Sequence, residues 1–301
     1  MSRTAVLLAE NPKVKSMILR RGVKGGLARQ FLAGEQLHEA LQVVKNLQEK
    51  QLTASIEFLA DDLVSAGETD EVVNQYSEIL KGISTFYPEA WVSVRLSALG
   101  LVADPAEARA RLVGLLENAV TRGSIMIMLT MEGAKYVQET LSIVNELHEQ
   151  YPNLGVTLQS NLRRTDRDVT DLLASGVTIR LVKGGYKESP AVAYTTRDEI
   201  KAAYRRQMFE LLQSGLGHSL ATHDVDLINS AKLYAKQRNI SQKTFGYEMF
   251  NGVRADLQSS LASAGYSVRI YLPYGQAWFP YVMARLEESP SGLGLVLSSM
   301  L

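Results

Sequence analysis

Short apolar runs rich in β-branched and aromatic residues recur along the chain from about residue 52. Each run is followed by a polar turn and then by a stretch with apolar residues at helical spacing. The runs predict eight strands, at Leu52–Ala60, Trp91–Leu96, Ile125–Met131, Gly155–Leu162, Thr178–Lys183, His218–Thr222, Lys243–Met249 and Val268–Pro273. The intervening stretches predict helices, among them Asp70–Ile83, Pro105–Arg122, Tyr136–Gln150 and Thr196–Gln213.

This alternation predicts an α/β fold in which eight parallel strands close into a (β/α)8 TIM-type barrel. The strands recur roughly every 25 to 40 residues, which is the spacing of a closed parallel barrel. A doubly wound open sheet is the alternative. However, no Gly-x-Gly-x-x-Gly turn follows the first predicted strand, as a dinucleotide-binding sheet of that kind would require. In a barrel, functional side chains are expected at the carboxyl ends of the strands.

The first 50 residues are predicted to be helical. In Gly34–Gln48 the apolar residues recur at helical spacing, at Leu37, Ala40, Leu41, Val44 and Leu47. We therefore expect residues 1–50 to pack as helices on the outside of a barrel formed by residues 51–301. No linker, internal repeat or low-complexity segment in the sequence indicates a further domain.

The composition excludes several classes of function. Thirty-two Lys and Arg balance thirty-two Asp and Glu, so no net charge attracts nucleic acid or an anionic membrane surface. The absence of Cys excludes disulfides, thiolate metal sites and cysteine nucleophiles. No signal peptide is evident near the start, and no apolar stretch is long enough to span a bilayer. We expect a soluble cytoplasmic protein without an integral membrane segment, in which redox chemistry would need a cofactor.

Cationic side chains stand on or directly after apolar strands at Arg95, Arg180 and Lys183. An unpaired buried cation is costly, so each of them needs either a carboxylate or a bound anion as its partner. An ion pair inside the barrel mouth would satisfy Arg95 or Arg180 without any ligand, and the available carboxylates are Glu57, Glu132 and Asp224. The other interpretation, which the excess of strand-end cations favours, is an anionic ligand.

Two further segments bear on the site. Arg180–Tyr186 reads RLVKGGY, and its glycines allow the backbone to approach a phosphate or a ring edge closely. In the aromatic segment RIYLPYGQAWFPYVMARLEE at residues 269–288, Tyr271 lies near a strand end, and Tyr281 and Arg285 share one helix face. An aromatic wall that includes an arginine could therefore line the site.

The histidines give little indication of catalysis or metal binding. His38 and His148 fall in predicted helices, and His218 inside a strand is typical of a satisfied core residue. His223 follows a strand and is the one histidine placed for function, although a structural role is equally compatible with that position. No second His or carboxylate stands at a convincing ligand spacing from it, so we expect no metal site.

At these strand ends the chain resembles the flavin-dependent proline dehydrogenases, specifically the short monofunctional bacterial form. RLVKGGY is similar to the family motif RLVKGAY, Ala221–His223 to ATH, and YLPYG with Trp278 to YVPYG and a following Trp. VTLQSNL at Val156–Leu162 is similar to VxLQAYL, and LTME at Leu129–Glu132 to IDME. The resemblance covers most of the chain and is weakest over the first 50 residues.

The resemblance implies a distorted (β/α)8 barrel with noncovalent FAD. The implied cofactor contacts are Met131, Gln159, Arg180, Val182, Lys183, Gly184, Gly185, Tyr186, Thr222, His223 and Asp224, the last standing where the family usually has Asn. The implied substrate-binding residues are Arg95, Thr130, Tyr271, Ala284, Arg285 and Glu288, of which Tyr271 and Arg285 join Arg180 as catalytic residues. Arg180 beside the flavin ring would stabilise the negative charge that develops during reduction.

The substrate pocket departs from the family pattern. Arg95 replaces a Lys, Thr130 replaces an Asp, and the paired arginines that clamp the proline carboxylate read Ala284-Arg285. At these positions the family has three cations and one anion, whereas this chain has two cations and no anion, so both charges sum to plus two. The pocket should still bind a carboxylate but in a different shape. Strand seven also departs, with Gly246, Glu248 and Asn251 where the family commonly has Glu, Gln and Tyr.

These observations favour an FAD-dependent dehydrogenase that oxidises a carbon–nitrogen bond of a small carboxylate-bearing amino or imino acid, with a best substrate other than free proline. The family usually passes electrons to a quinone, but the sequence does not identify the acceptor. One alternative is a flavin-binding or anion-binding barrel that has lost dehydrogenase activity. Another is an aldolase-type barrel in which Lys183 forms a Schiff base.

Overall fold

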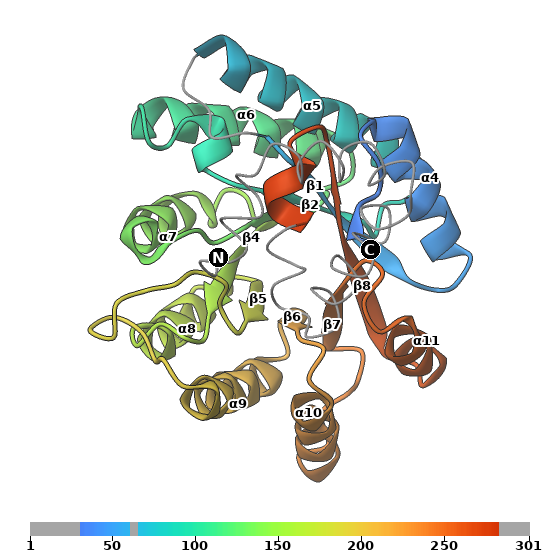
Figure 1. Ribbon diagram of the computed structural model, residues 1–301, viewed down its shortest axis with the longest axis vertical. Helices are drawn as coiled ribbons and strands as arrows, with labels where there is room; N and C mark the ends of the chain where they lie inside the picture. The colour runs from blue at the N-terminus through green and yellow to red at the C-terminus, as the bar shows by residue number, and fades with distance from the viewer. Residues whose placement is uncertain (1–30, 61–65, 283–301) are drawn as a thin grey trace, which may run out of the picture.

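The computed structural model describes residues 31–60 and 66–282, in which parallel strands close into a barrel (Figure 1). Each strand pairs with the next along the chain, and the last pairs with the first. The strands are β1 Thr53–Phe58, β2 Trp91–Val94, β3 Ile127–Leu129, β4 Leu154–Gln159, β5 Ile179–Val182, β6 His218–Ala221, β7 Phe245–Phe250 and β8 Ser267–Tyr274. Every predicted strand overlaps one of these, so the predicted (β/α)8 barrel is confirmed and the open sheet is wrong.

Helices surround the barrel on the outside (Figure 1). The helices are α4 Leu37–Gln48, α5 Ala66–Ser84, α6 Pro105–Thr121, α7 Val137–Leu147, α8 Thr165–Ala174, α9 Arg197–Ser214, α10 Val225–Gln237 and α11 Ala255–Ser263. The first residues of two helices are fixed by capping side chains. Asp104 caps α6 by accepting from the backbone N–H groups of Ala106 and Glu107, and Thr196 and Glu199 form a reciprocal capping box at the start of α9. None of the described helices is both long and apolar enough to cross a bilayer.

Helix α4 lies outside the barrel beside β1 and β8 (Figure 1). Its apolar face buries Ala40, Val44 and Leu47. The chain just before it is fixed to β8, because the backbone N–H of Ala33 donates to the carbonyl of Pro273 at 2.8 Å. Helix α4 therefore packs as the helical periodicity predicts but begins at Leu37 rather than Gly34, and residues 1–30 lie outside the described residues. The proposed boundary near residue 50 stays a prediction.

The strands divide their side chains between two environments. Side chains such as Ile56, Val92 and Leu158 are buried and apolar, whereas the alternating positions Ser55 and Ser93 place their hydroxyls 2.7 Å apart across neighbouring strands. Bulky aliphatic residues usually fill the interior of such a barrel. Here a set of hydroxyl and charged side chains lies there, which is where the candidate site begins.

His218 belongs to the buried part of the fold, as its position inside a strand predicts. Its Nδ1 accepts from the backbone N–H of Ile179 at 3.0 Å, and its Nε2 lies 2.7 Å from the Ser214 hydroxyl on α9. Because Nδ1 accepts a hydrogen bond, the ring is neutral with its proton on Nε2. Burial lowers the pKa of His218 from 6.5 to about 4.

This shift predicts a loss of stability in acid. Between the unfolded pKa of 6.5 and the folded pKa of about 4, the unfolded chain binds a proton that the folded protein excludes, so the free energy of unfolding falls as the pH is lowered through this window. We expect His218 to account for about 3 kcal/mol of that loss. Chemical denaturation at pH 7, 5.5 and 4 measures it, and His218→Asn, which can still accept from Ile179, should flatten the slope. An equally steep slope in the variant would assign the acid sensitivity to other groups.

Candidate active site

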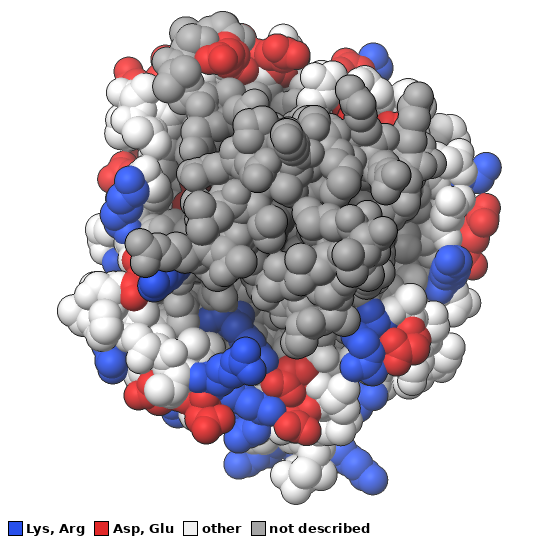
Figure 2. Space-filling view, in the orientation of Figure 1, with Lys and Arg blue, Asp and Glu red and all other residues white. Residues whose placement is uncertain are grey.

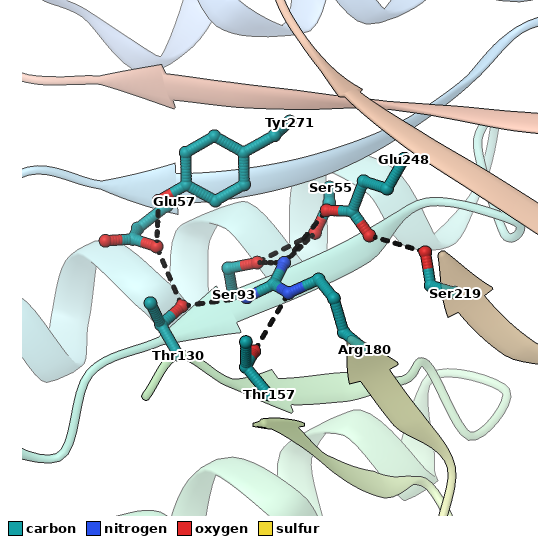
Figure 3. A network of polar contacts seen from close by, with 9 residues as sticks. All are labelled: Ser55, Glu57, Ser93, Thr130, Thr157, Arg180, Ser219, Glu248 and Tyr271. Carbon is teal, nitrogen blue, oxygen red and sulfur yellow. Dashed lines mark hydrogen bonds and ion pairs between the residues drawn. The ribbon is translucent and has the colours of Figure 1, made fainter. Parts of the chain in front are cut away.

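Arg180 is the centre of a polar network inside the barrel (Figure 3). It projects from β5 with 3% of its surface exposed. Its Nε donates to the Thr157 hydroxyl at 2.9 Å, and its Nη2 donates to the Thr130 hydroxyl at 3.0 Å. Its Nη1 lies within hydrogen-bonding distance of three acceptors, Ser93 Oγ at 2.9 Å, Ser55 Oγ at 3.4 Å and Glu248 Oε1 at 2.9 Å.

Glu248 on β7 is the carboxylate that balances this cation. The two side chains form an ion pair at 2.9 Å with only 3% and 2% of them exposed. The second Glu248 oxygen accepts from the Ser219 hydroxyl on β6 at 2.9 Å. The expectation that Arg180 pairs with a carboxylate or an anion holds, but the partner is Glu248 rather than Glu57, Glu132 or Asp224.

The hydrogen bonds of Arg180 leave one donor over. A guanidinium has five N–H groups. The Nε hydrogen goes to Thr157, the two Nη1 hydrogens serve Ser93, Ser55 and Glu248, and one Nη2 hydrogen goes to Thr130. The other Nη2 hydrogen has no acceptor among residues 31–60 and 66–282. A buried charged donor without an acceptor is costly, so this group suits a ligand atom.

Glu57 joins three of the residues that the sequence assigns to the substrate pocket. It is fully buried, and its Oε1 accepts from Arg95 Nε at 2.7 Å. Its Oε2 accepts from the Thr130 hydroxyl at 2.9 Å and from the Tyr271 hydroxyl (Figure 3). Arg95, Thr130 and Tyr271 therefore lie together, as predicted, through a carboxylate that was considered only as an ion-pair partner.

This arrangement corrects the charge estimated for the pocket. The sum of plus two counted Arg95 and Arg285 and no anion, but Glu57 lies directly on Arg95. The Glu57 carboxylate holds the pKa of Arg95 above its ordinary value, so Arg95 is a cation that lies directly against a carboxylate. Arg95 is thus offset by a neighbouring charge and offers a substrate only its remaining donors, with 30% of its side chain exposed.

Tyr271 contacts both Glu57 and Arg180, and its side chain is an uncharged phenol. Burial, assisted by the nearby Glu57, raises the pKa of Tyr271 well above its ordinary value, so its hydroxyl donates to that carboxylate. Its ring centroid lies 5.5 Å from the Arg180 guanidinium carbon and 6.4 Å from the Tyr281 ring. Two members of the predicted aromatic wall thus lie together, Tyr271 beside Arg180 and Tyr281 beside Tyr271, while Arg285 lies outside the described residues.

Polar groups lie at the carboxyl ends of β4 and β5, beyond Arg180 along the strand direction. Gln159 is buried, and its Nε2 donates to the backbone carbonyl of Glu132 at 2.9 Å. Its Oε1 accepts from the backbone N–H of Gly185 at 3.4 Å. Met131 is buried nearby, while Val182 is half-buried at the end of its strand. The Gln159 amide is thus fixed in orientation by the loops on either side.

The position of Gly184, just after β5, has no room for a side chain. Its φ of 116° lies in the left-handed region, and a Cβ there would come within 2.1 Å of the Asn161 side-chain oxygen. Both effects favour glycine. A Cβ at Gly185 would meet no atom within 4 Å, so its surroundings leave open space beside the backbone.

Lys183 lies at the rim in a mixed cluster of charges. Its Nζ donates to Asp224 at 2.8 Å, and Lys201 on α9 contacts both Asp224 and Asp226. Burial opposes the ionisation of Asp224, but its bonds with the two lysines outweigh burial and lower its pKa to about 2. Figure 2 shows such basic and acidic side chains interspersed along this side of the molecule, over α9 and α10.

His223 and Thr222 lie at the end of β6 as predicted. The His223 Nε2 accepts from the backbone N–H of Phe250 at 3.0 Å, and the two rings stack at 5.4 Å. The Thr222 hydroxyl accepts from the backbone N–H of Asp224 at 3.1 Å. These contacts give His223 a structural function in holding β7 beside β6. Tyr186, by contrast, is 45% exposed in the loop after β5.

The hydroxyls of Ser55, Ser93, Thr157 and Ser219 were not anticipated, although the first three lie between apolar residues on their strands. No group of three metal-binding side chains occurs in the described part of the chain. Ala284, Arg285 and Glu288 lie outside the described residues.

The family model described as proline dehydrogenase matches residues 40–294. "Proline dehydrogenase 1" of Bacillus subtilis subsp. natto is 30% identical over 98% of this chain and 97% of its own length. "Proline dehydrogenase" of Deinococcus radiodurans is 32% identical over 99% and 97%, respectively.

Solved structures agree with the fold. Proline utilization A from Bdellovibrio bacteriovorus, inactivated by N-propargylglycine, superposes with a TM-score of 0.82 at 21% identity over 96% of this chain. Proline utilization A from Corynebacterium freiburgense gives a TM-score of 0.76 at 20% identity. This chain spans only about a third of those longer proteins, 36% and 34% of their lengths.

Proposed function

The chain belongs to the proline dehydrogenase family of oxidoreductases, and on that premise we propose that it is an FAD-dependent dehydrogenase that oxidises the carbon–nitrogen bond of an amino or imino acid. The observation that supports this most directly is Arg180, a buried guanidinium with one Nη2 hydrogen left without an acceptor among the described residues. Two of its neighbours, Thr130 and Tyr271, are residues that the family motifs assign to the substrate.

The described residues fit a flavin in chemical terms. Bound FAD would supply the hydride acceptor for the substrate carbon next to nitrogen. The Nη2 hydrogen of Arg180 that has no acceptor in the described part of the chain can donate to the reducible ring and stabilise its developing negative charge. The oriented Gln159 amide can hydrogen-bond a ring edge. Lys183 and the backbone at Gly184 and Gly185 can hold the remainder of the cofactor. Met131, Val182, Tyr186, Thr222, His223 and Asp224 complete the proposed cofactor contacts.

The substrate side of the site would bind a carboxylate and exclude water. We propose that Arg285 binds the substrate carboxylate, with Arg95 as a weaker second donor because Glu57 offsets its charge. The Tyr271 ring lies beside Arg180 and its hydroxyl donates to Glu57, so this side chain would orient the substrate ring or chain. Thr130, Ala284 and Glu288 would shape the rest of the pocket for a substrate other than free proline.

We propose three further properties of this protein. The electron acceptor would be a quinone, the protein would act in the cytoplasm, and residues 1–50 would form a helical segment on a flavin-binding barrel. The family provides the first of these, while the balanced charge and absence of Cys support the second. The position of α4 outside β1 and β8 supports the third.

A second candidate function is a flavin-binding or anion-binding barrel without dehydrogenase activity. The pairing of Arg95 with Glu57 favours it, because an offset cation binds a substrate carboxylate less strongly. The Schiff-base alternative is less favoured, since Lys183 is held in an ion pair with Asp224.

Absorbance spectroscopy of the purified protein separates these functions. A dehydrogenase should bind FAD and lose the yellow flavin absorbance anaerobically when one amino or imino acid is added. A protein that binds FAD but is bleached by no compound in a broad amino-acid panel supports the second function. A protein that cannot be loaded with FAD excludes both flavin-dependent functions.

Replacement of Arg285 with alanine tests the proposed carboxylate contact. We expect Arg285→Ala to weaken substrate binding by about 2 to 5 kcal/mol if the arginine pairs with a desolvated carboxylate, while FAD stays bound. Titration of the bound flavin spectrum with substrate under anaerobic conditions measures the change. A variant that loses FAD and keeps its substrate affinity would place Arg285 in the cofactor site.

A further inference from the structure

We propose that Glu248 is a positioning residue that holds Arg180 in place and, by offsetting its charge, lowers the reduction potential of bound FAD. This inference rests on the proposed function, since it requires Arg180 to lie beside the flavin. It assigns a role to a carboxylate that the family motifs leave without one.

The carboxylate of Glu248 is directed at Arg180 from two strands away in the barrel. The two residues lie on β7 and β5, separated by β6, and their side chains meet inside the barrel at 2.9 Å (Figure 3). Ser219 on the intervening β6 donates to the second carboxylate oxygen at 2.9 Å. Each oxygen of Glu248 thus has a partner, one on β5 and one on β6, and these two contacts fix the orientation of the carboxylate.

Stability alone does not explain this ion pair. Removing two charges from water is expensive, and a buried pair is often no more stabilising than apolar residues of similar volume. The other groups that Arg180 contacts are neutral hydroxyls, those of Ser55, Ser93, Thr130 and Thr157. Within the described residues, Glu248 is therefore the one carboxylate that directly contacts the Arg180 guanidinium.

This charge has a consequence for an adjacent flavin. Reduced FAD carries more negative charge than oxidised FAD, so a neighbouring cation stabilises the reduced form and raises the reduction potential. A carboxylate on that cation opposes the effect. Glu248 should therefore make the flavin harder to reduce than Arg180 alone would, while it keeps the spare Nη2 hydrogen of Arg180 in a constant position.

Glu248→Gln removes the charge and preserves the shape. The amide oxygen can still accept from Arg180, and the amide nitrogen can donate to the Ser219 oxygen, whose hydroxyl hydrogen is free to rotate. We expect at least a tenfold increase in the ratio of reduced to oxidised FAD at a fixed potential, which is about 30 mV for a two-electron couple. Equilibration of the holoenzyme with a reference dye measures this potential without any substrate.

A matched control removes a carboxylate charge far from the barrel mouth. Glu146 on α7 is 56% exposed and pairs with Arg109 on the surface. Glu146→Gln should leave the potential unchanged, which would show that the shift in Glu248→Gln does not come from the net charge of the protein.

Each outcome decides the inference. A holoenzyme whose potential is the same in wild type and Glu248→Gln overturns it and leaves the proposed function intact. A protein that binds no FAD overturns both. If Glu248→Gln does not fold, Glu248→Asp withdraws the carboxylate from Arg180 by one methylene and should also raise the potential, and an unchanged value there overturns the inference.

Discussion

Arg180→Ala is expected to slow flavin reduction by about 10²- to 10³-fold, the loss typical of one preorganised donor aimed at a developing negative charge. The variant also leaves Glu248 buried at 2% exposure without its cation. Breaking a buried pair in this way costs about 3 to 5 kcal/mol in the free energy of unfolding. Stopped-flow reduction by the best substrate measures the first effect, and chemical denaturation of the apoprotein measures the second.

The double variant Arg180→Ala/Glu248→Gln separates catalysis from structure. It removes the orphaned carboxylate, so most of the lost stability should return, whereas flavin reduction should stay slow because the donor is still absent. Recovery of fast reduction in the double variant would mean that Arg180 acts only through the fold. Unchanged FAD affinity and reduction rate in the single variant would contradict the assignment of Arg180 altogether.

The barrel could be predicted because its signal is local and repeated. Each strand is a short apolar run, and each helix presents a continuous apolar face, so the order of elements follows from periodicity alone. The position of the site follows next, because the carboxyl ends of parallel strands meet at one face of a barrel. Thr130 directly follows β3, whereas Arg180 and Tyr271 lie within β5 and β8, and their side chains meet inside the barrel.

The partners of these residues could not be predicted in the same way. Arg180 and Glu248 are on β5 and β7, which are not hydrogen-bonded to each other, so their contact depends on the register of two strand pairs and on the path of a long side chain. The hydroxyls around Arg180 gave a weak signal, because Ser and Thr on strands are common. Their alternation with apolar residues, together with a buried arginine that needs acceptors, could have indicated them.

A substrate other than free L-proline is expected to reduce the flavin with the higher kcat/KM. Loss of one charge-assisted donor to a carboxylate costs about 1.5 to 3 kcal/mol unless another group replaces it, and the chain has Ala284 at one of the two clamp positions. Arg95 replaces it only in part, because its Nε is bound to Glu57 at 2.7 Å and its charge is offset there. Hydride transfer also requires the reacting atoms to approach to roughly 3 to 3.5 Å in alignment, so a displaced carboxylate lowers the rate as well as the affinity.

Restoring the clamp should therefore shift the preference toward proline. Ala284→Arg adds the missing donor. We expect it to raise the ratio of kcat/KM for L-proline to kcat/KM for the best wild-type substrate at least tenfold, which corresponds to about 1.4 kcal/mol. Thr130→Asp should assist only in combination with Ala284→Arg. On its own it places a second carboxylate beside Glu57, which accepts from the Thr130 hydroxyl at 2.9 Å in the wild type, and the two like charges repel. Thr130→Asp alone is thus the matched control and should lower stability without the gain for proline. If the wild-type protein oxidises L-proline better than every cyclic and modified amino acid tested, then Arg95 and Arg285 together bind the same ligand as the paired arginines, and the altered positions do not change specificity.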